Sequence, residues 1–154
     1  MAKFAAGDKA PLFEGVNQEG KKISLSDFKG KKLILYFYPK DDTPGCTAES
    51  CNLNDNYEMW LNKGFEVVGV SPDNEKSHLK FIDKFGLKFN LIADTKNEIL
   101  EAYGVWGEKS MYGKKYMGVL RTTYVINENG IIEAVFEKVE TGNHTKQIIE
   151  ALNI

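Results

Sequence analysis

Residues 32–37 read Lys-Leu-Ile-Leu-Tyr-Phe, a nearly continuous apolar run that is rich in β-forming residues. A run of this kind, bounded here by lysine and by Pro39, is typical of a strand that is covered on both faces. The run therefore predicts a sheet with other structure packed against each of its faces.

A helix is expected soon after this strand. Thr43 followed by Pro44 is a helix-start signature, with Thr at the cap and Pro at the first helical position. Apolar residues then recur at helical spacing, and Gly64 is suited to end the helix. The predicted apolar stripe comprises Leu53, Tyr57, Trp60 and Leu61.

Strand and helix patterns continue to alternate through the middle of the chain. We expect a strand over 66–71, a helix with Leu79, Ile82 and Phe85 on one face, and a short strand over 91–93. A further helix should contain Ile99, Leu100 and Tyr103. This alternation predicts βαβ units with a largely parallel arrangement.

Both ends of the chain depart from the alternation. Residues 10–25 predict a short hairpin and 26–28 a turn of helix, whereas 122–126 and 131–136 predict an antiparallel hairpin around the turn 127–130. The last helix carries Ile148, Ile149 and Leu152, with Asn143-His144-Thr145 as its cap. The resulting fold class is α/β and thioredoxin-like, with a mixed central sheet, helices on both faces and an N-terminal hairpin extension. Residues 1–154 should form one domain.

Composition excludes several function classes. Lys plus Arg number 20 and Asp plus Glu number 22, so the charge gives no reason to expect nucleic acid or an anionic membrane as partner. No apolar run is long enough to span a bilayer, and no signal peptide is recognisable, which favours the cytoplasm. His78 and His144 have no cysteine or histidine at ligand spacing; we expect both on the surface, and no metal.

The two cysteines, Cys46 and Cys51, suggest redox chemistry. They are too few for a disulfide scaffold or a four-cysteine zinc site, and they lie five positions apart. If Thr43 caps the helix, Cys46 lies in its first turn, where free N–H groups and the helix dipole favour the nucleophilic thiolate. The Thr43 hydroxyl can lie near the same sulfur. The alternative is an inert Cys46 in an ordinary helix start.

The spacing of the two cysteines predicts a conformational switch. Residues five apart in an intact α-helix have Cα atoms roughly 8.7 Å apart, whereas a disulfide tolerates only up to about 6.8 Å. A bond between them therefore requires the first turns of the helix to unwind. The free-energy cost of this unwinding should be small, because the segment contains several weak helix formers. These are Thr47, Ser50, Asn52, Asn54 and Asn56.

The segment that ends at Cys46 resembles the peroxiredoxin active-site signature Pro-x-x-x-Thr-x-x-Cys, matched by Pro39, Thr43 and Cys46. Cys51 resembles the second cysteine of the Q-type or bacterioferritin-comigratory-protein subfamily. The resemblance continues through 104–109 and 113–114 to Arg121 and covers nearly the whole chain.

This resemblance implies a thiol peroxidase that needs no metal or organic cofactor. Cys46 would attack a hydroperoxide and become a sulfenic acid, Cys51 would resolve it to an intramolecular disulfide, and thioredoxin or a similar dithiol would restore both thiols. The protein would be a monomer or weak homodimer.

The resemblance also assigns supporting roles. Arg121, the Thr43 hydroxyl and the Cys46 backbone N–H would surround the peroxide; Pro39 would shield the site, and Glu49 would hold Arg121. Without the resemblance, Arg121 is an ordinary surface charge, Glu49 a complement to the helix N-terminus and Pro39 a strand terminator. Trp106, between glycines, is expected in a loop, where it could line the pocket or pack beneath it.

Two rival functions compete with the thiol peroxidase. A disulfide reductase of the thioredoxin type would show Cys-x-x-Cys and a proline shortly before the hairpin strand, and the chain has neither, since its prolines are Pro11, Pro39, Pro44 and Pro72. A redox-sensing or chaperone-like binding module that uses the same disulfide switch remains the alternative.

Overall fold

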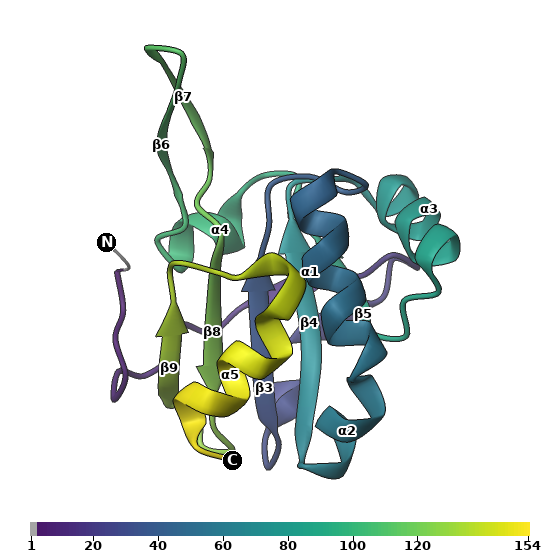
Figure 1. The fold of residues 1–154 in the computed structure, drawn as a ribbon, viewed down its shortest axis with the longest axis vertical. Helices are drawn as coiled ribbons and strands as arrows, with labels where there is room; N and C mark the ends of the chain where they lie inside the picture. The colour runs from purple at the N-terminus through teal and green to yellow at the C-terminus, as the bar shows by residue number, and fades with distance from the viewer. Residues whose placement is uncertain (1–2) are drawn as a thin grey trace.

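The computed structural model describes residues 3–154 and is built on a five-stranded sheet (Figure 1). The strand order is β5-β4-β3-β8-β9; β3, β4 and β5 run parallel, and β8 and β9 are antiparallel to their neighbours. The strands are β3 (Lys32–Phe37), β4 (Phe65–Ser71), β5 (Asn90–Ala93), β8 (Thr122–Ile126) and β9 (Ile132–Phe136). The predicted mixed sheet, with βαβ first and the hairpin last, is confirmed.

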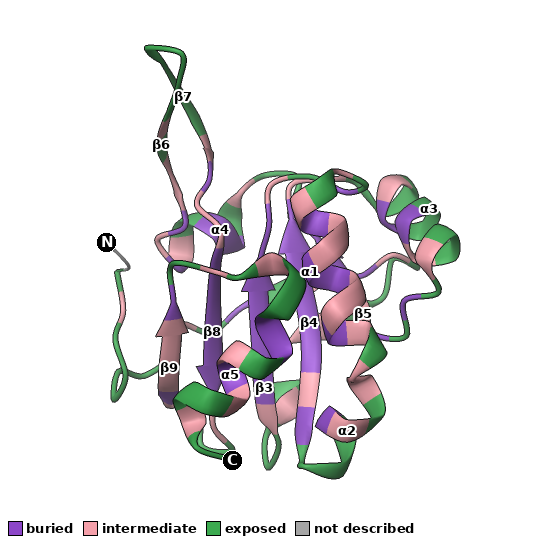
Figure 2. Ribbon diagram, viewed as in Figure 1, coloured by how far each residue is buried: buried purple, intermediate pink, exposed green. Residues whose placement is uncertain are grey.

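Structure covers the sheet on both faces, as the apolar run of β3 predicts. Leu33, Leu35 and Phe37 point into one buried cluster, and Ile34 and Tyr36 into the other. Figure 2 shows this strand buried along nearly its whole length. The alternation follows from the two-residue repeat of a strand, which sends successive side chains to opposite faces.

Helices form a layer on each face. The cluster around Ile34 receives buried side chains from α1 (Pro44–Asp55), α2 (Tyr57–Asn62), α3 (Glu75–Phe85) and α5 (His144–Leu152); these are Cys46 and Leu53 from α1, followed by Trp60, Phe81 and Ile148. The cluster around Leu35 receives Ile99 and Leu100 from α4 (Glu98–Ala102) and Tyr103, which follows that helix.

The N-terminal hairpin extension is confirmed. Strands β1 (Glu14–Val16) and β2 (Lys22–Ser24) form a separate antiparallel sheet, and the 3-10 turn η1 (Leu25–Phe28) follows. Gly15 lies so close to the main sheet that an added Cβ would sit 2.7 Å from Ile92 Cγ2, which no side chain tolerates. The hairpin therefore closes over the β5 edge.

The predicted long helix is two helices. Asn56 ends α1, because its side-chain Nδ2 donates to the Asn52 carbonyl at 2.8 Å and its backbone N–H bonds Leu53 O at 3.3 Å. Because the helix is interrupted, the predicted apolar face does not continue unchanged into α2. Leu61, predicted to face the core, is 44% exposed. Gly64 has the expected positive φ of 84°.

The face predicted for α3 is confirmed for Ile82 and Phe85, which pack against the core, but it was wrong for Leu79, and the placement of both histidines was wrong. Leu79 is 44% exposed, whereas His78 and Phe81 are buried. His78 and His144, expected on the surface, are fully buried, each with hydrogen bonds to both ring nitrogens. Such bonds are what allow a polar ring to be buried.

A second hairpin was not predicted. Strands β6 (Trp106–Met111) and β7 (Lys114–Val119) pair antiparallel and project beyond the main sheet (Figure 1). Trp106 thus begins a strand and is half-buried. The hairpin exposes residues on both faces and so lacks the alternating pattern that would have signalled strands.

Within residues 3–154, no helix combines the length and the apolar character that crossing a bilayer requires.

Candidate active site

Cys46 lies in the first turn of α1, at the end of the sheet where β3 finishes. Thr43 occupies the N-cap position with extended backbone, Pro44 is the first helical residue, and Thr43 O accepts the Thr47 N–H at 2.8 Å. The unpaired N–H groups of the first helical turn therefore lie at the same end of α1 as the Cys46 sulfur, where they favour an anion.

Arg121 contacts the Cys46 sulfur. Arg121 Nη2 donates to Cys46 Sγ at 3.4 Å, and Arg121 Nη1 donates to Glu49 Oε1 at 2.8 Å. Burial acts to lower the pKa of Arg121, but the negative charges of Glu49 and Cys46 outweigh it and the pKa is raised above its usual value. The guanidinium is thus a permanent cation beside the sulfur.

Cys46 is 1% exposed, whereas the side chain of Arg121 beside it is 24% exposed. The sulfur is more enclosed than the sequence suggested. It is nevertheless at the start of a helix and within reach of a guanidinium.

Glu49 is completely buried behind Arg121. Burial raises the pKa of Glu49 to about 7, and the Arg121 charge and hydrogen bond oppose this rise. Its second oxygen, Oε2, has no hydrogen-bond partner among the described residues and lies 3.7 Å from His144 Nε2. Burial lowers the pKa of His144 to about 4, so at neutral pH this contact joins a neutral imidazole to the carboxyl group and is no ion pair.

His144 has a defined orientation. Its Nδ1 lies 2.9 Å from Gln147 Oε1, and that oxygen also accepts the Glu140 N–H, while Gln147 Nε2 donates to Lys138 O. These bonds fix the amide, so we assign the imidazole proton to Nδ1. Nε2 then accepts the Thr123 hydroxyl at 2.8 Å.

Thr43 and Pro39 lie on the loop that precedes Cys46. The Thr43 hydroxyl donates to Lys40 O at 2.8 Å, and no bond from it to the sulfur occurs in the described part of the chain. A hydroxyl also carries acceptor lone pairs, so Thr43 can still accept the O–H of a peroxide. Pro39 is half-buried at the end of β3.

Gly45 is a site residue that the sequence reasoning missed. A Cβ at this position would lie 3.2 Å from Arg121 Nη2, tighter than most real contacts. The absence of a side chain therefore lets the guanidinium lie against the first turn of α1. The available signal in the sequence was a glycine directly before Cys46.

Cys51 lies in the same helix and is half-buried. Burial, and to a lesser extent Asp55, raises the pKa of the Cys51 thiol. Cys46 and Cys51 are both free thiols. Both lie within the continuous helix α1.

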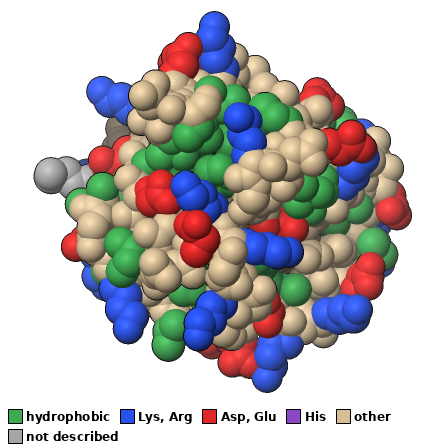
Figure 3. All heavy atoms as spheres, turned by 90° about the horizontal axis from the view of Figure 1, so that it is seen from below, with side chains coloured by type: hydrophobic (Ala, Val, Ile, Leu, Met, Phe, Trp, Pro, Cys, Tyr) green, Lys and Arg blue, Asp and Glu red, His purple; other side chains and the backbone are tan. Residues whose placement is uncertain are grey.

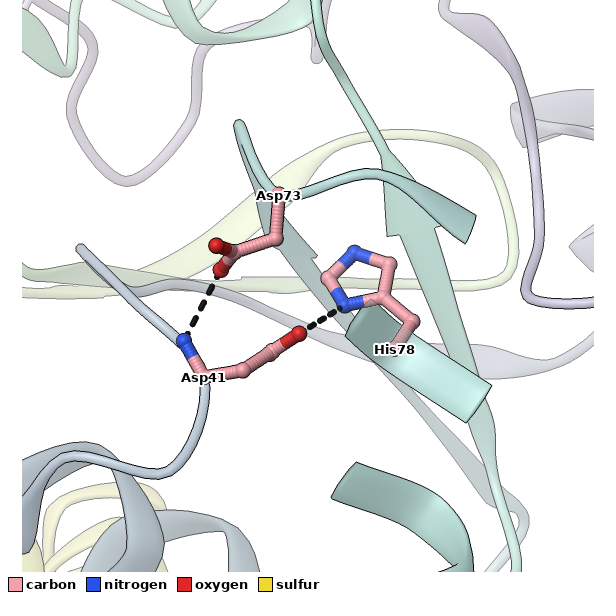
Figure 4. Close-up of side chains that lie close together, drawn as sticks. All are labelled: Asp41, Asp73 and His78. Carbon is pink, nitrogen blue, oxygen red and sulfur yellow. Dashed lines mark hydrogen bonds and ion pairs between the residues drawn. The ribbon is translucent and has the colours of Figure 1, made fainter. Parts of the chain in front are cut away.

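A buried polar cluster anchors the loop that carries Thr43 (Figure 4). His78 Nε2 lies 2.9 Å from Ile92 O and His78 Nδ1 lies 2.7 Å from Asp41 Oδ2. A carbonyl only accepts, so Nε2 must carry a proton, and a second proton must lie between Nδ1 and Asp41. The Asp41 N–H in turn donates to Asp73 Oδ2 at 2.8 Å.

Ligand atoms of Asp41, Asp73 and His78 lie within 4.8 Å of one another, a spacing that a metal ion could use. Their donors and acceptors are already engaged, however: Asp41 also accepts the hydroxyls of Tyr38 and Ser77. The cluster is therefore best described as a hydrogen-bonded anchor for the loop.

A cavity of about 300 Å³ lies at the opposite end of the molecule from Cys46. It is lined by Leu25, Phe28 and Ile126, with Lys9, Lys29 and Lys31 among its other residues. Figure 3 shows this lower end, where hydrophobic side chains gather beside basic ones. None of the predicted site residues lines it.

Comparison with known proteins gives a consistent result. Residues 6–135 match the AhpC/TSA family. The chain is 46% identical over 153 residues to the putative peroxiredoxin Bcp of Buchnera aphidicola, covering 99% of this chain and 97% of the relative. It is 40% identical over 152 residues to peroxiredoxin Bcp of Escherichia coli, covering 99% and 97%.

Solved structures agree. Peroxiredoxin Q of Xanthomonas campestris superposes with a TM-score of 0.86 at 33% identity, covering 94% of this chain and 95% of that one. A second structure, of the X. campestris bacterioferritin comigratory protein and concerned with alkyl peroxide reduction, superposes with a TM-score of 0.86 at 32% identity, covering 95% and 98%.

Proposed function

The chain belongs to the AhpC/TSA family, among its Bcp and peroxiredoxin Q members, and we propose that Cys46 is the sulfur that carries out its thiol-dependent peroxidase reaction. One observation carries the assignment: in the first turn of α1, Cys46 Sγ lies 3.4 Å from Arg121 Nη2.

The chemistry follows from this arrangement. The Cys46 thiolate attacks the terminal oxygen of R–O–OH, so the S–O bond forms as the O–O bond breaks. The products are the sulfenic acid Cys46–SOH and RO⁻, which takes a proton to become ROH. Negative charge moves from sulfur to oxygen during this step, and the Arg121 guanidinium and the helix N–H groups stabilise it at fixed positions.

Thr43 and Pro39 complete the proposed pocket. The Thr43 hydroxyl donates its hydrogen bond to Lys40 O. Its lone pairs point elsewhere and can accept a hydrogen bond from the peroxide O–H. Pro39 has no backbone N–H and limits water beside the sulfur. Glu49 holds one edge of Arg121 while the other edge contacts the sulfur.

Cys51 is the proposed resolving residue. Its thiol condenses with Cys46–SOH, releasing water and forming a disulfide, after α1 unwinds. A dithiol reductant, for which we propose thioredoxin, then returns both thiols by exchange. We further propose hydroperoxides as the substrate class, including the alkyl peroxides named for the X. campestris relative, a cytoplasmic location, and one domain over residues 1–154.

The alternative of a redox-sensing or chaperone-like module is not favoured by the relatives, which are named as peroxiredoxins.

The test is a thiol count after a substoichiometric pulse of hydrogen peroxide. We expect two thiols to disappear for each peroxide consumed, with a Cys46–Cys51 disulfide within one chain, much faster than free cysteine reacts. Cys46→Ser should consume no peroxide, and Cys51→Ser should stop at a sulfenic acid that dimedone traps. If Cys51→Ser turns over normally with thioredoxin, the resolving role is wrong.

A further inference from the structure

Glu49 lies between Cys46 and Cys51, inside the helical segment that must unwind before the two sulfurs can bond. Residues five apart in a helix are roughly 8.7 Å apart at Cα, beyond the reach of about 6.8 Å for a disulfide. If Cys51 resolves Cys46, as proposed above, Glu49 therefore leaves its place whenever the disulfide forms.

The place that Glu49 leaves suits a carboxylic acid better than a carboxylate. The side chain is completely buried, and its Oε1 accepts a hydrogen bond from Arg121 Nη1; the Thr123 hydroxyl, which is bonded to His144 Nε2, is the smallest of the groups that lower the pKa of Glu49. Oε2 is buried with no partner in residues 3–154. A buried carboxylate with one oxygen unpaired loses hydration that the protein does not fully replace.

The groups around Glu49 do not change this conclusion at neutral pH. Arg121, preceding β8, is a permanent cation, and the pKa of Tyr36, on β3, lies well above its usual value, chiefly because of burial. His144, on α5, is neutral because burial lowers its pKa to about 4. Cys46, on α1 itself, shares Arg121 with Glu49, so two acidic groups compete for one cation.

We propose that Glu49 makes the unwinding of α1, and hence the resolving step, dependent on pH. The ionised carboxylate favours the unwound helix because unwinding transfers it to water, whereas the protonated carboxyl group favours the wound helix. Glu49 thus acts in both steps of the proposed cycle. In the peroxide step it holds Arg121, and in the resolving step its ionised form favours the unwinding that exposes it to water.

The sign and size follow from burial. The pKa of Glu49 is raised from 4.5 to about 7 in the wound helix, so the stabilisation of that helix is fully present below pH 4.5 and is lost as pH rises through 7. Across this window the ratio of unwound to wound helix should rise on the order of 100-fold. At a pH between the two values, unwinding releases about one proton.

Hydrogen exchange of the amides at 47–52 measures the unwinding directly. The Cys46→Ser background removes the thiolate charge, and between pH 5 and 8 neither His144 nor Cys51 titrates, because the pKa of His144 is about 4 and that of Cys51 is raised above 9.0. We expect the opening constant, corrected for intrinsic exchange, to rise with pH and level off above 7.

Two further variants in the same background sharpen this measurement. Glu49→Gln should make the opening constant independent of pH. The matched control Glu58→Gln, at an exposed position of α2, should keep the full dependence. An opening constant that is flat with pH while Glu49 is present overturns the inference, even if Glu49→Gln does not fold.

The reduction potential of the wild-type disulfide gives an independent readout, set with a dithiol redox buffer and without peroxide. Between pH 5 and 7, reduction of the disulfide should take up about one more proton in the wild type than in Glu49→Gln. The reduction potential of the wild type should therefore fall more steeply with pH. Equal slopes in the two proteins contradict the inference. A protein that forms no Cys46–Cys51 disulfide at all contradicts the resolving role instead, and the hydrogen-exchange result then still decides the inference.

Discussion

Arg121 is the residue on which the proposed peroxide chemistry depends most. It contacts the Cys46 sulfur with one nitrogen and the buried Glu49 with another, so the fold fixes its position. Donors held in place contribute more to a transition state than donors that must reorganise.

Arg121→Ala should slow the reaction of Cys46 with hydrogen peroxide about 10²- to 10³-fold, the cost typical of losing one fixed donor to a developing charge. Stopped-flow measurement of the second-order rate constant checks this. An unchanged rate constant would dismiss the charge-stabilisation argument.

The same substitution leaves Glu49 buried without its cation, which by itself costs about 3–5 kcal/mol when the carboxylate stays charged. The double variant Arg121→Ala/Glu49→Gln is therefore the control. It should recover most of the stability in urea unfolding while the peroxide rate stays low. If the peroxide rate constant also recovered in the double variant, Arg121 would contribute only to the stability of the fold and not to the peroxide step.

At the scale of single residues, the sequence predicted the pairing of Arg121 with Cys46 and Glu49 through a motif resemblance. It did not predict His144 or Gly45. Their roles depend on distances of a few ångström between α5, α1 and the start of β8, which residue spacing along the chain does not encode.

The element on which the proposed disulfide switch depends is α1, and hydrogen bonds from Asn52 connect it to the C-terminal helix α5. Asn52 Oδ1 accepts the Thr145 N–H at 2.7 Å, Asn52 O accepts the Thr145 hydroxyl at 3.3 Å, and Asn52 Nδ2 donates to Gly142 O at 3.2 Å. Asn52 thus caps α5 in place of Asn143, which occupies the cap position but makes no side-chain cap bond.

Asn52→Ala should lower the stability of the protein by about 1 kcal/mol, the usual cost of losing a helix cap. Because Asn52 adjoins Cys51, the conversion of sulfenic acid to disulfide should also become several-fold faster. Urea unfolding and rapid-quench mass spectrometry measure the two effects. Asn62→Ala, at the exposed end of α2, is the control. Equal effects of the two substitutions would contradict the proposal that the hydrogen bonds of Asn52 to α5 restrain α1.

The elements were predicted best where the side chains on both faces are buried. The bounds of β3 and β8 agree with the structure, since their side chains enter the core. The break at Asn56 was missed because side-chain bonds to Asn52 caused it, and the β6–β7 hairpin was missed because it buries neither face.

At the scale of the whole molecule, the thioredoxin-like arrangement could be predicted because alternation of strands and helices leaves few topologies. The single-domain assignment and the monomeric or weakly dimeric state stay predictions. The buried histidines could not be predicted, since their partners come from distant segments: Asp41 and Ile92 for His78, and Thr123 for His144.

Burial of His144 contributes a loss of stability in acid, which the raised pKa of Glu49 opposes over the same pH range. Its pKa is lowered from 6.5 to about 4 on folding, so its contribution is fully present above pH 6.5 and is lost as pH falls through 4. The loss should be on the order of 3 kcal/mol.

Urea unfolding at several pH values between 4 and 7 measures this loss. As the pH falls, the wild type should lose stability relative to His144→Gln, because Glu49 titrates in both proteins and cancels in the comparison. Identical acid limbs would contradict the assignment of a neutral buried imidazole.

The most direct test of the account is the site and rate of the first oxidation in Cys51→Ser. One equivalent of hydrogen peroxide should add one oxygen at Cys46, trapped there by dimedone, far faster than free cysteine is oxidised. Oxidation at the rate of free cysteine, or at any residue other than Cys46, would contradict the claim that the start of α1 and Arg121 together make this sulfur the peroxide nucleophile.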